Sequence, residues 1–264
     1  FFRRLYFFLM LLVSSRKYQI IIYRYIPLDI FSVFLPKKIA NKMICVCHTK
    51  TDNYFKIQES WLSEIISWLD ALLGKFLFKR VKMVIGVNAE VLDHEINRLK
   101  SSEKPSSLYT NGIYKSNWLN PVEDRREGDH KICFIASKFF PWNGLELILD
   151  NLESNTHVTG WQLHIVGDCT TAQIKRLDSY NIKSRTILHG SLNSQELRDL
   201  LQCMDVSLGA FALHLIGLKQ AASLKVRLSL GEGVPVYSGH IDSGIPSEFE
   251  YFRVGAPNIE KILA

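Results

Sequence analysis

Residues 220–237 read QAASLKVRLSLGEGVPVY, and this stretch decides the fold class of the chain. It begins as a polar loop and continues as a helical segment with a possible N-cap at Ser223. The helix ends at Gly231 and Gly233, and the VPVY that follows predicts a short buried strand. A helix that leads through a glycine turn into a core strand is typical of an α/β protein. The predicted apolar positions of the helix are Leu224, Leu228 and Leu230.

Lys225 stands in the first turn of this helix, next to backbone N–H groups that have no partner within the helix. A cation and free N–H groups at one helix start can together hold an anion such as a phosphate group. The alternative is a surface lysine on a structural αβ unit, and the local pattern alone favours that alternative. The rest of the chain therefore has to decide between the two interpretations.

The second half of the chain repeats the order strand, helix, strand several times. Several of the strands end at a glycine, as at Gly167, Gly190 and Gly209. This alternation predicts a Rossmann-like parallel sheet with right-handed crossovers. The sequence contains neither G-x-G-x-x-G nor a Walker A motif, which makes a dehydrogenase or a P-loop NTPase a poor fit. The predicted strands are residues 131–136, 161–166, 186–189, 206–208 and 234–237.

The first half shows the same alternation, with predicted strands at residues 18–25, 42–47 and 82–87. The strand over 18–25, YQIIIYRY, has an unbroken apolar centre, which predicts burial on both of its faces. Residues 58–79 predict a long amphipathic helix whose apolar stripe faces the core. The stripe consists of Trp61, Ile65, Trp68, Leu72 and Phe76.

His48 follows the predicted strand 42–47, at the place where ligands bind in open parallel sheets. It is a candidate to contact a substrate hydroxyl or phosphate, or to act in acid–base chemistry. A histidine that only caps its loop is an equally good interpretation of the residues alone.

The composition is that of a globular protein, with 47% apolar and 22% charged residues over 264 positions. Residues 1–128 carry 20 Lys and Arg against 12 Asp and Glu, whereas residues 129–264 carry 12 against 14. The net charges of +8 and −2 predict two units, of which the first faces an anionic substrate, a phosphorylated lipid or an anionic membrane. The lack of a zinc-finger spacing, an RNP-like aromatic run or an Arg-rich helix argues against nucleic acid as a partner.

The five cysteines are an odd number without the spacing of a secreted disulfide scaffold, which indicates a reducing compartment. Cys45 and Cys47 are one residue too close for a CxxC pair, and they flank Val46 in an apolar run. We therefore interpret them as buried core thiols.

Residues 5–13, LYFFLMLLV, form an apolar run about half as long as the ~20 residues needed to span a bilayer. Arg3 and Arg4 precede the run, as in a signal peptide, but no small-residue cleavage site follows it. The run therefore predicts a helix that is either buried or in contact with a membrane surface.

The polar and charged residues 119–130 predict a linker between two domains. The first domain is expected over residues 1–118 and the second over residues 131–264. Two Rossmann-like domains joined in this way are expected to place both sets of strand ends on a common cleft.

In the order of its segments the chain resembles the family 4 glycosyltransferases, which have the GT-B fold. The second half carries KICFIASKFFPWNGLELIL, WQLHIVGD, TILHGSLNSQELRDLLQCMDVSLGA and SLKVRLSLGEGVPVY in the family's order. The segments MVIGVNAEVLDHEI and SLYTNGI resemble the crossing between the two domains. The resemblance covers nearly the whole chain. It implies an α/β protein with two Rossmann-like domains and parallel sheets, in a fragment that lacks the start of the acceptor domain and the C-terminal end.

The resemblance also implies retaining transfer of a sugar from a nucleotide diphosphate donor, with no bound cofactor and no required metal. It makes Lys225 the lysine that contacts the donor phosphate and His48 the histidine near the reacting sugar, so both are catalytic candidates. Lys138 takes the place of the arginine that the family has at Ser137. The further donor-binding candidates are Asn143, Gly144, Gly167, Gly190, Ser191, Gln220, Ser223 and Leu224.

The family's pair of glutamates aligns with Gln220 and Leu228 in this chain. Gln220 can still hydrogen-bond a sugar hydroxyl, whereas the side chain of Leu228 cannot. One expected function is an active glycosyltransferase that builds a bacterial surface polysaccharide by transfer to a glycan or a lipid-linked acceptor. The alternative is a catalytically impaired relative that binds a nucleotide sugar or a partner without turnover. In both cases the implied location is cytoplasmic, with peripheral contact at the inner membrane face.

Overall fold

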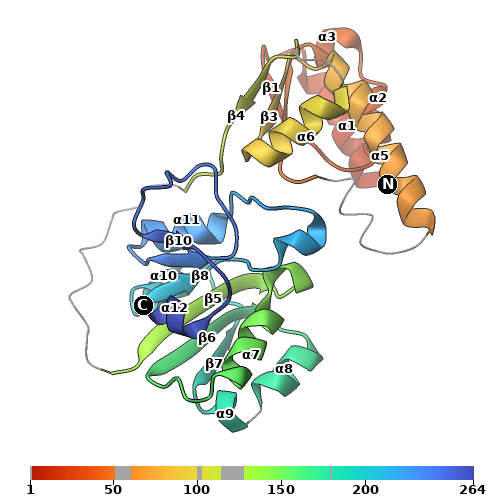
Figure 1. Cartoon of the computed structure of the whole chain (residues 1–264). Coiled ribbons are helices and arrows are strands. Elements are labelled where there is room, and N and C mark those ends of the chain that lie inside the picture. Colours follow the sequence, from red (N-terminus) through yellow and green to blue (C-terminus); the bar gives the residue numbers. More distant parts are fainter. Residues whose placement is uncertain (1, 51–60, 100–102, 114–127, 179) are drawn as a thin grey trace. The chain divides into compact units, whose positions relative to one another are not determined.

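The computed structural model describes all of the chain except residues 1, 51–60, 100–102, 114–127 and 179. The chain divides into two compact units, shown in Figure 1. The first is Phe1–Thr110 with Ile216–Leu218, and the second is Asn111–Leu215 with Lys219–Ala264. The expected linker at residues 119–130 lies mostly outside the described residues, so the expected domain bounds 1–118 and 131–264 stay a prediction.

The first unit is a parallel sheet flanked by helices (Figure 1). In its described residues the strand order is β1-β2-β3-β4, and all pairs of neighbours are parallel. The strands are β1 (Ile21–Arg24), β2 (Met43–Cys47), β3 (Met83–Gly86) and β4 (Ser106–Leu108). The helices are α1 (Phe2–Ser14), α2 (Ile30–Val33), α3 (Lys37–Ala40), α5 (Trp61–Arg80) and α6 (Ala89–Leu99).

Strand β2 runs through the centre of this sheet and supplies much of the core of the first unit. Met43, Cys45 and Cys47 alternate along it, and all three are buried. Burial raises the pKa of both thiols above its usual value, which keeps them protonated. The interpretation of these cysteines as core thiols is confirmed.

The prediction that the first strand is buried on both faces is wrong. Strand β1 is the edge of the described sheet, and α1 covers the face that carries Tyr23, with the Phe7 and Tyr23 rings 6.2 Å apart. On the other face the side chain of Ile22 is 77% exposed. An edge strand covered on one side buries alternate residues only, even when its sequence is continuously apolar.

The prediction that the apolar stripe of residues 58–79 faces the core is also wrong. In α5 the side chain of Trp68 is 63% exposed and that of Phe76 is 50% exposed. The buried side of the helix carries Ser63, Ser67 and Asp70 in its first half and the apolar Leu77 and Phe78 near its end.

A buried polar network explains the orientation of α5. The carboxylate of Asp70 accepts a hydrogen bond from the hydroxyl of Tyr25 at 2.8 Å and another from the backbone N–H of Leu28 at 2.8 Å. It also pairs with Arg98 of α6 at 3.1 Å. An unpaired buried carboxylate is far more costly than an exposed apolar side chain, so these bonds decide which side of α5 faces the sheet.

The second unit is a larger parallel sheet with helices on both faces. In its described residues the strand order is β10-β9-β8-β5-β6-β7, and all pairs of neighbours are parallel. The strands are β5 (His130–Lys138), β6 (Trp161–Asp168), β7 (Thr186–Gly190), β8 (Val206–Leu208), β9 (Val236–Ser238) and β10 (Phe252–Val254). The helices are α7 (Leu145–Ser154), α8 (Thr171–Leu177), α9 (Tyr180–Lys183), α10 (Ser194–Leu201), α11 (Leu224–Gly231) and α12 (Ile259–Leu263). The expected fold class, α/β with two parallel sheets, is confirmed.

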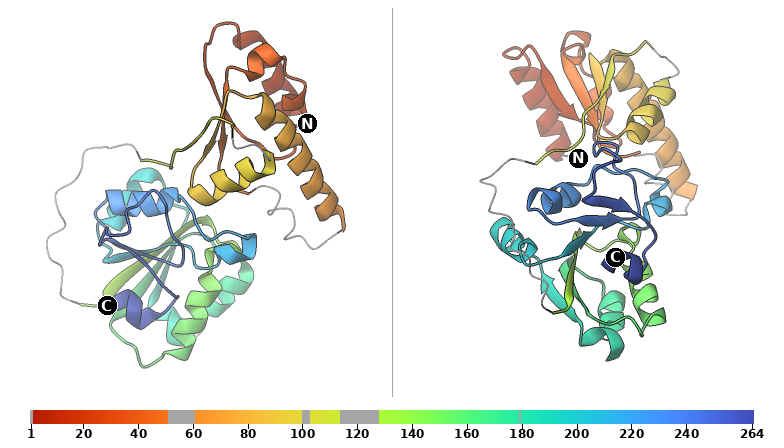
Figure 2. Two further views of the ribbon diagram at one scale, coloured as in Figure 1. Left: turned by 45° about the horizontal axis from the view of Figure 1, so that its top comes forward. Right: turned by 60° about the vertical axis from the view of Figure 1, so that its left-hand side comes forward.

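Strand β5 lies at the centre of this unit, between two helix layers (Figure 2). Its residues Ile132 and Phe134 belong to one apolar cluster, which includes side chains from α7, α8, α9 and α12. Cys133 and Ile135 belong to a second cluster on the other face, with side chains from α10 and α11. The alternation along β5 explains why its sequence is continuously apolar, as in strands buried on both faces.

The buried residues of α11 differ from the leucines Leu224, Leu228 and Leu230 that the sequence pattern predicts. The helix buries Val226 and Ser229, whereas Leu224 is 57% exposed, so the prediction for Leu224 is wrong. Side chains three and four positions apart share one face of a helix, and Lys225 lies four positions before Ser229. The inward face of α11 therefore includes Lys225.

None of the helices in the described parts of the chain is both long enough and apolar enough to span a bilayer.

Candidate functional site

The strands of the second unit bring several polar and glycine residues to one edge of the sheet. Because neighbouring strands are parallel, their carboxyl ends lie at the same edge, where ligands bind in open α/β sheets. Strand β5 ends at Lys138, β6 at Asp168, β7 at Gly190 and β9 at Ser238. Lys225, at the start of α11, follows β8 in the chain.

The side chain of Lys225 points into the protein. Its ammonium lies 5.3 Å from the centre of the Phe134 ring, and this nitrogen is buried without a hydrogen-bond partner among the described residues. Burial lowers the pKa of Lys225 from 10.5 to about 8, so the group is mostly charged at neutral pH. The ring face offers it a cation–π contact, but a buried ammonium without a hydrogen-bonding partner remains costly. A bound anion would supply that partner.

His240 lies two residues beyond β9 and is buried near Lys225. Its Nδ1 is 2.7 Å from the hydroxyl of Ser238 and 3.1 Å from the carbonyl oxygen of Ala210. A carbonyl only accepts, so Nδ1 carries a proton and donates to it. Burial lowers the pKa of His240, and the charge of Lys225 adds to the lowering. The imidazole is therefore neutral, and its buried Nε2, which has no hydrogen-bond partner in the described parts of the chain, is an acceptor.

A buried ion pair joins α11 to the loop that carries His240. Two guanidinium nitrogens of Arg227 contact the two carboxylate oxygens of Asp242, and the Nη2–Oδ1 distance is 2.9 Å. Asp242 also accepts the backbone N–H of Gly244 at 2.9 Å. This bidentate geometry fixes both partners, so Lys225 and His240 are held on one rigid support.

The loop after β5 carries an exposed cation next to stacked aromatic rings. The ammonium of Lys138 lies 5.6 Å from the centre of the Phe140 ring. Phe140 in turn stacks on Trp142, with ring centres 4.5 Å apart and planes tilted by 10°. Because Lys138 is exposed, its flexible side chain can move towards an anion at the strand ends.

Asn143 and Gly144 shape the turn between β5 and α7. The side chain of Asn143 is buried, and its Oδ1 accepts the backbone N–H of Phe140 at 2.8 Å. Gly144 has φ +78°, and a Cβ added there would lie 2.9 Å from the Cβ of Phe211. Both residues thus have a structural task, and their contact with a donor stays a prediction.

The next two strand ends differ in how closely they are packed. Gly167 has φ +117°, and a Cβ there would lie 1.5 Å from the carbonyl oxygen of Ala136 on β5, so only glycine fits. Gly190 has φ +65° with open space around it. The hydroxyl of Ser191 donates to Asp168 at 3.3 Å, which joins the ends of β6 and β7. Donor binding by Gly167, Gly190 and Ser191 stays a prediction.

The loop before α11 contains three further candidates. Gln220 forms an isolated parallel bridge with Ile241, which ties the loop to the segment after β9. Ser223 occupies the N-cap position as predicted, although its side chain makes no capping hydrogen bond. Leu224 is exposed beside it. Their roles in donor binding stay predictions.

His48 follows β2 in the first unit and is half-buried. Burial lowers its pKa and the positive charge of Arg24 adds to the lowering, which favours the neutral imidazole that a base or an acceptor requires. Lys50 nearby in sequence pairs with Glu90 at 2.6 Å. Lys225 belongs to the other unit, and a shared role of His48 and Lys225 stays a prediction.

Sequence reasoning missed His240, Arg227 and Asp242. His240 stands just beyond a predicted core strand, and the strand-end argument that singled out His48 could have found it. The Arg227–Asp242 pair joins residues 15 positions apart on a helix and a loop, and no local pattern marks such a contact. Among the described residues, no group of three or more His, Cys, Asp and Glu side chains is placed to hold a metal ion.

The two parallel α/β units agree with the expected GT-B fold. No protein-family profile matches the chain, and no curated protein sequence matches it. Solved structures of glycosyltransferases do match.

One of them is sucrose-phosphate synthase from Thermosynechococcus elongatus, with 15% identity, a TM-score of 0.63 and coverage of 96% of this chain and 64% of that chain. A glycosyltransferase from Rickettsia africae has 14% identity and a TM-score of 0.63, with coverage of 97% and 67%. HepE from Anabaena, in complex with UDP, has 11% identity and a TM-score of 0.59, with coverage of 88% and 70%. The chain thus spans about two thirds of the length of these proteins. At these identities the likeness establishes the fold.

Proposed function

We propose that the second unit binds the diphosphate of a nucleotide sugar, and that the protein transfers the sugar to a glycan or a lipid-linked acceptor. The observation that carries this proposal is the buried ammonium of Lys225, to which no residue that the structure describes offers a hydrogen bond. A phosphate oxygen would form a charge-assisted hydrogen bond with it. The occurrence of glycosyltransferases among proteins of the same fold, one of them in complex with UDP, supports this ligand class.

The chemistry of such a transfer fits the arrangement around α11. Negative charge grows on the leaving diphosphate, and preorganised cations and N–H groups stabilise it. The ammonium of Lys225 is already desolvated before a donor binds, and the N–H groups at the start of α11 lack partners within the helix. Lys138 supplies a second, mobile cation. The neutral Nε2 of His240 accepts a hydrogen bond from a hydroxyl of the donor.

The proposed reaction retains the configuration of the sugar, with His48 near the reacting centre. It uses side-chain cations on the diphosphate and needs no bound metal or other cofactor. The proposed setting is bacterial surface polysaccharide synthesis in the cytoplasm, with peripheral contact at the inner membrane face. The positive charge of residues 1–128 supports contact with an anionic surface.

Leu228 favours a second candidate function, binding of a nucleotide sugar or a partner without turnover. Its side chain packs against the cluster of Cys133, Ile135 and Val234, so it belongs to the core and not to the ligand site. The glutamate that the resembled family has at this place is therefore not replaced by another polar group. Loss of that carboxylate is expected to weaken donor binding by about 1–3 kcal/mol, roughly tenfold to hundredfold.

A panel of nucleotide sugars, assayed in parallel for binding by calorimetry and for turnover, tests the proposal. Lys225→Met removes the charge but keeps the length of the side chain, and Lys175→Met on the exposed side of α8 is the matched control. We expect at least a tenfold loss of affinity and of turnover in Lys225→Met and no change in Lys175→Met.

Binding of a donor without turnover on any acceptor would select the second candidate function. An unchanged donor affinity in Lys225→Met would contradict both candidates, because both place the diphosphate on this ammonium.

A further inference from the structure

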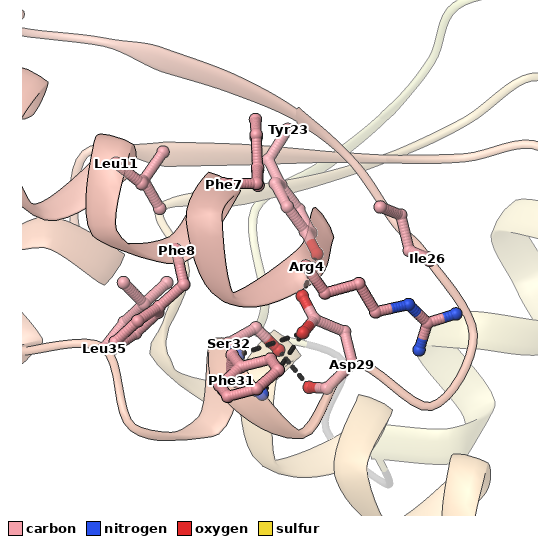
Figure 3. A pocket seen from close by; sticks show the side chains of 10 residues that line it. All are labelled: Arg4, Phe7, Phe8, Leu11, Tyr23, Ile26, Asp29, Phe31, Ser32 and Leu35. Atoms are coloured by element: carbon pink, nitrogen blue, oxygen red, sulfur yellow. Dashed lines mark hydrogen bonds between the residues drawn. The ribbon is translucent and has the colours of Figure 1, made fainter. Parts of the chain in front are cut away.

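Two buried polar atoms of the second unit, Nζ of Lys225 and Nε2 of His240, have no hydrogen-bond partner among the residues that the structure describes. The cavity of the first unit between α1, β1 and α2 differs in this respect (Figure 3). There the hydroxyl of Tyr23 donates to the carboxylate of Asp29, and the hydroxyl of Ser32 donates to the carbonyl oxygen of Asp29 at 2.7 Å. A buried polar group that lacks a partner gains more from a polar ligand than one that is already paired. The second unit is therefore where a polar ligand gains most.

The tautomer of His240 is determined by the partners of its Nδ1. This atom lies 3.1 Å from the carbonyl oxygen of Ala210, which only accepts, so Nδ1 carries the proton of the neutral ring. Nδ1 is also 2.7 Å from the hydroxyl oxygen of Ser238, which accepts the backbone N–H of His240 at 3.4 Å. The residue is only 2% exposed, so its ring is held in place. Nε2 therefore presents a lone pair, and a ligand atom that meets it has to be a hydrogen-bond donor.

His240 and Lys225 occupy corresponding places on the two sides of a buried ion pair. Lys225 stands two residues before Arg227, and His240 stands two residues before Asp242. The guanidinium of Arg227 meets the carboxylate of Asp242 with an Nη2–Oδ1 distance of 2.9 Å. Burial lowers the pKa of His240 and the charge of Lys225 lowers it further, so the two groups are close enough to interact. A ligand that puts a phosphate oxygen on the ammonium thus brings its neighbouring atoms towards Nε2.

The two groups require opposite partners on one ligand. The ammonium of Lys225 donates and binds an anionic oxygen, whereas the lone pair on Nε2 of His240 repels such an oxygen. In a nucleotide sugar the diphosphate stands between two groups that carry hydroxyls, the ribose and the transferred sugar. Either can donate to Nε2. A ligand that lacks the hydroxyl leaves Nε2 buried without a partner, and a site of this kind rejects such a ligand.

We infer that His240 is a specificity-determining residue, whose Nε2 accepts a hydrogen bond from one hydroxyl of the donor, on the ribose or on the transferred sugar. The inference rests on the proposed function and adds which donors the site rejects. Donors in which hydrogen or fluorine replaces that hydroxyl bind weakly although their diphosphate is intact, because neither atom donates a hydrogen bond.

Two replacements of His240 separate the acceptor from the bonds that hold the ring. His240→Asn places an amide nitrogen where Nδ1 donates to Ala210, but it has no atom at the position of Nε2. His240→Gln is longer and places an amide oxygen close to the position of Nε2. His157→Asn, whose side chain is 70% exposed in the wild-type protein, is the matched control. Urea unfolding checks that each variant is folded before its affinity is measured.

Calorimetry with replaced hydroxyls tests the inference. The diphosphates of uridine, guanosine, adenosine and cytidine and their 2′-deoxy and 3′-deoxy forms examine the ribose. Deoxyfluoro forms of the tightest-binding nucleotide sugar examine the transferred sugar. In the wild-type protein we expect one replacement to lower the affinity at least tenfold. In His240→Asn we expect the unmodified ligand to bind at least tenfold more weakly and the same replacement to change the affinity less than twofold, whereas His240→Gln and His157→Asn keep a preference of at least fivefold.

The inference would be overturned if no replacement lowered the affinity of the wild-type protein, or if every replacement had the same effect in His240→Asn. Lys225→Met is expected to weaken the unmodified and the replaced ligands by the same factor, because it removes the diphosphate contact and leaves the hydroxyl contact. Binding that depends on Lys225 but not on any hydroxyl would overturn the inference alone. Binding that does not depend on Lys225 would contradict the proposed function, so the two fail separately.

Discussion

Lys225 is unfavourable for folding and useful for binding an anion. In the unfolded chain its pKa is near 10.5, whereas burial lowers it to about 8 in the folded protein. The folded state therefore binds the proton less tightly, and the protein pays a stability penalty wherever the group is charged. The penalty is complete below about pH 8, shrinks between pH 8 and 10.5, and is absent above that range.

Replacing Lys225 is expected to stabilise the protein. Lys225→Met should raise the free energy of unfolding at pH 7 by about 3 kcal/mol, and the gain should disappear as the pH rises from 8 to 10.5. Urea unfolding of both proteins across this range measures the difference, with Lys175→Met as the control. A destabilised Lys225→Met at pH 7 would show that the ammonium has a stabilising partner.

At the level of residues, sequence reasoning located Lys225 but not its surroundings. Its place in the first turn of a helix could be predicted, because the residues around a helix start form a recognisable local pattern. The contact with Phe134 joins positions 91 apart, and the contact of His240 with Ala210 joins positions 30 apart. Such contacts depend on the order of strands in the sheet, which spacing along the chain does not encode.

At the level of elements, the close approach of β5 and β6 gives a sharp test of the sheet. Gly167→Ala is expected to cost at least about 3 kcal/mol of unfolding free energy, because a Cβ would lie 1.5 Å from the carbonyl oxygen of Ala136. Gly160→Ala is the matched control, since Gly160 also has a positive φ, +77°, but open space around it. That control is expected to cost about 1–2 kcal/mol. Equal costs would contradict the close strand packing.

The existence of most strands could be predicted, but which faces are buried could not. Residues 42–47 and 131–136 have continuous apolar runs, and both form central strands. Residues 18–25 also have a continuous apolar centre, yet β1 lies at the edge of the described sheet. The stripe of α5 has a clear helical period, yet the ion pair between Asp70 and Arg98 turns the other side of the helix inward. The period of the apolar residues predicts that a helix has an apolar face. Contacts with residues distant in the sequence determine whether that face is buried.

At the level of the whole molecule, alternation of strands and helices predicted two parallel α/β units, and both are present. The uneven charge of the two halves is read directly from the sequence, and the anionic partner expected for the first unit stays a prediction. The division between the units was placed near residues 119–130, most of which lie outside the described residues.

The affinity of the tightest-binding nucleoside diphosphate, measured by calorimetry from pH 7 to pH 9, tests most directly whether Lys225 holds the donor. We expect a nearly constant affinity up to about pH 8 in the wild-type protein, then a fall that approaches tenfold per pH unit as the ammonium deprotonates. Lys225→Met is expected to bind at least tenfold more weakly at pH 7 and to show no such fall. The same affinity and the same pH profile in both proteins would contradict the assignment of Lys225 to the donor diphosphate.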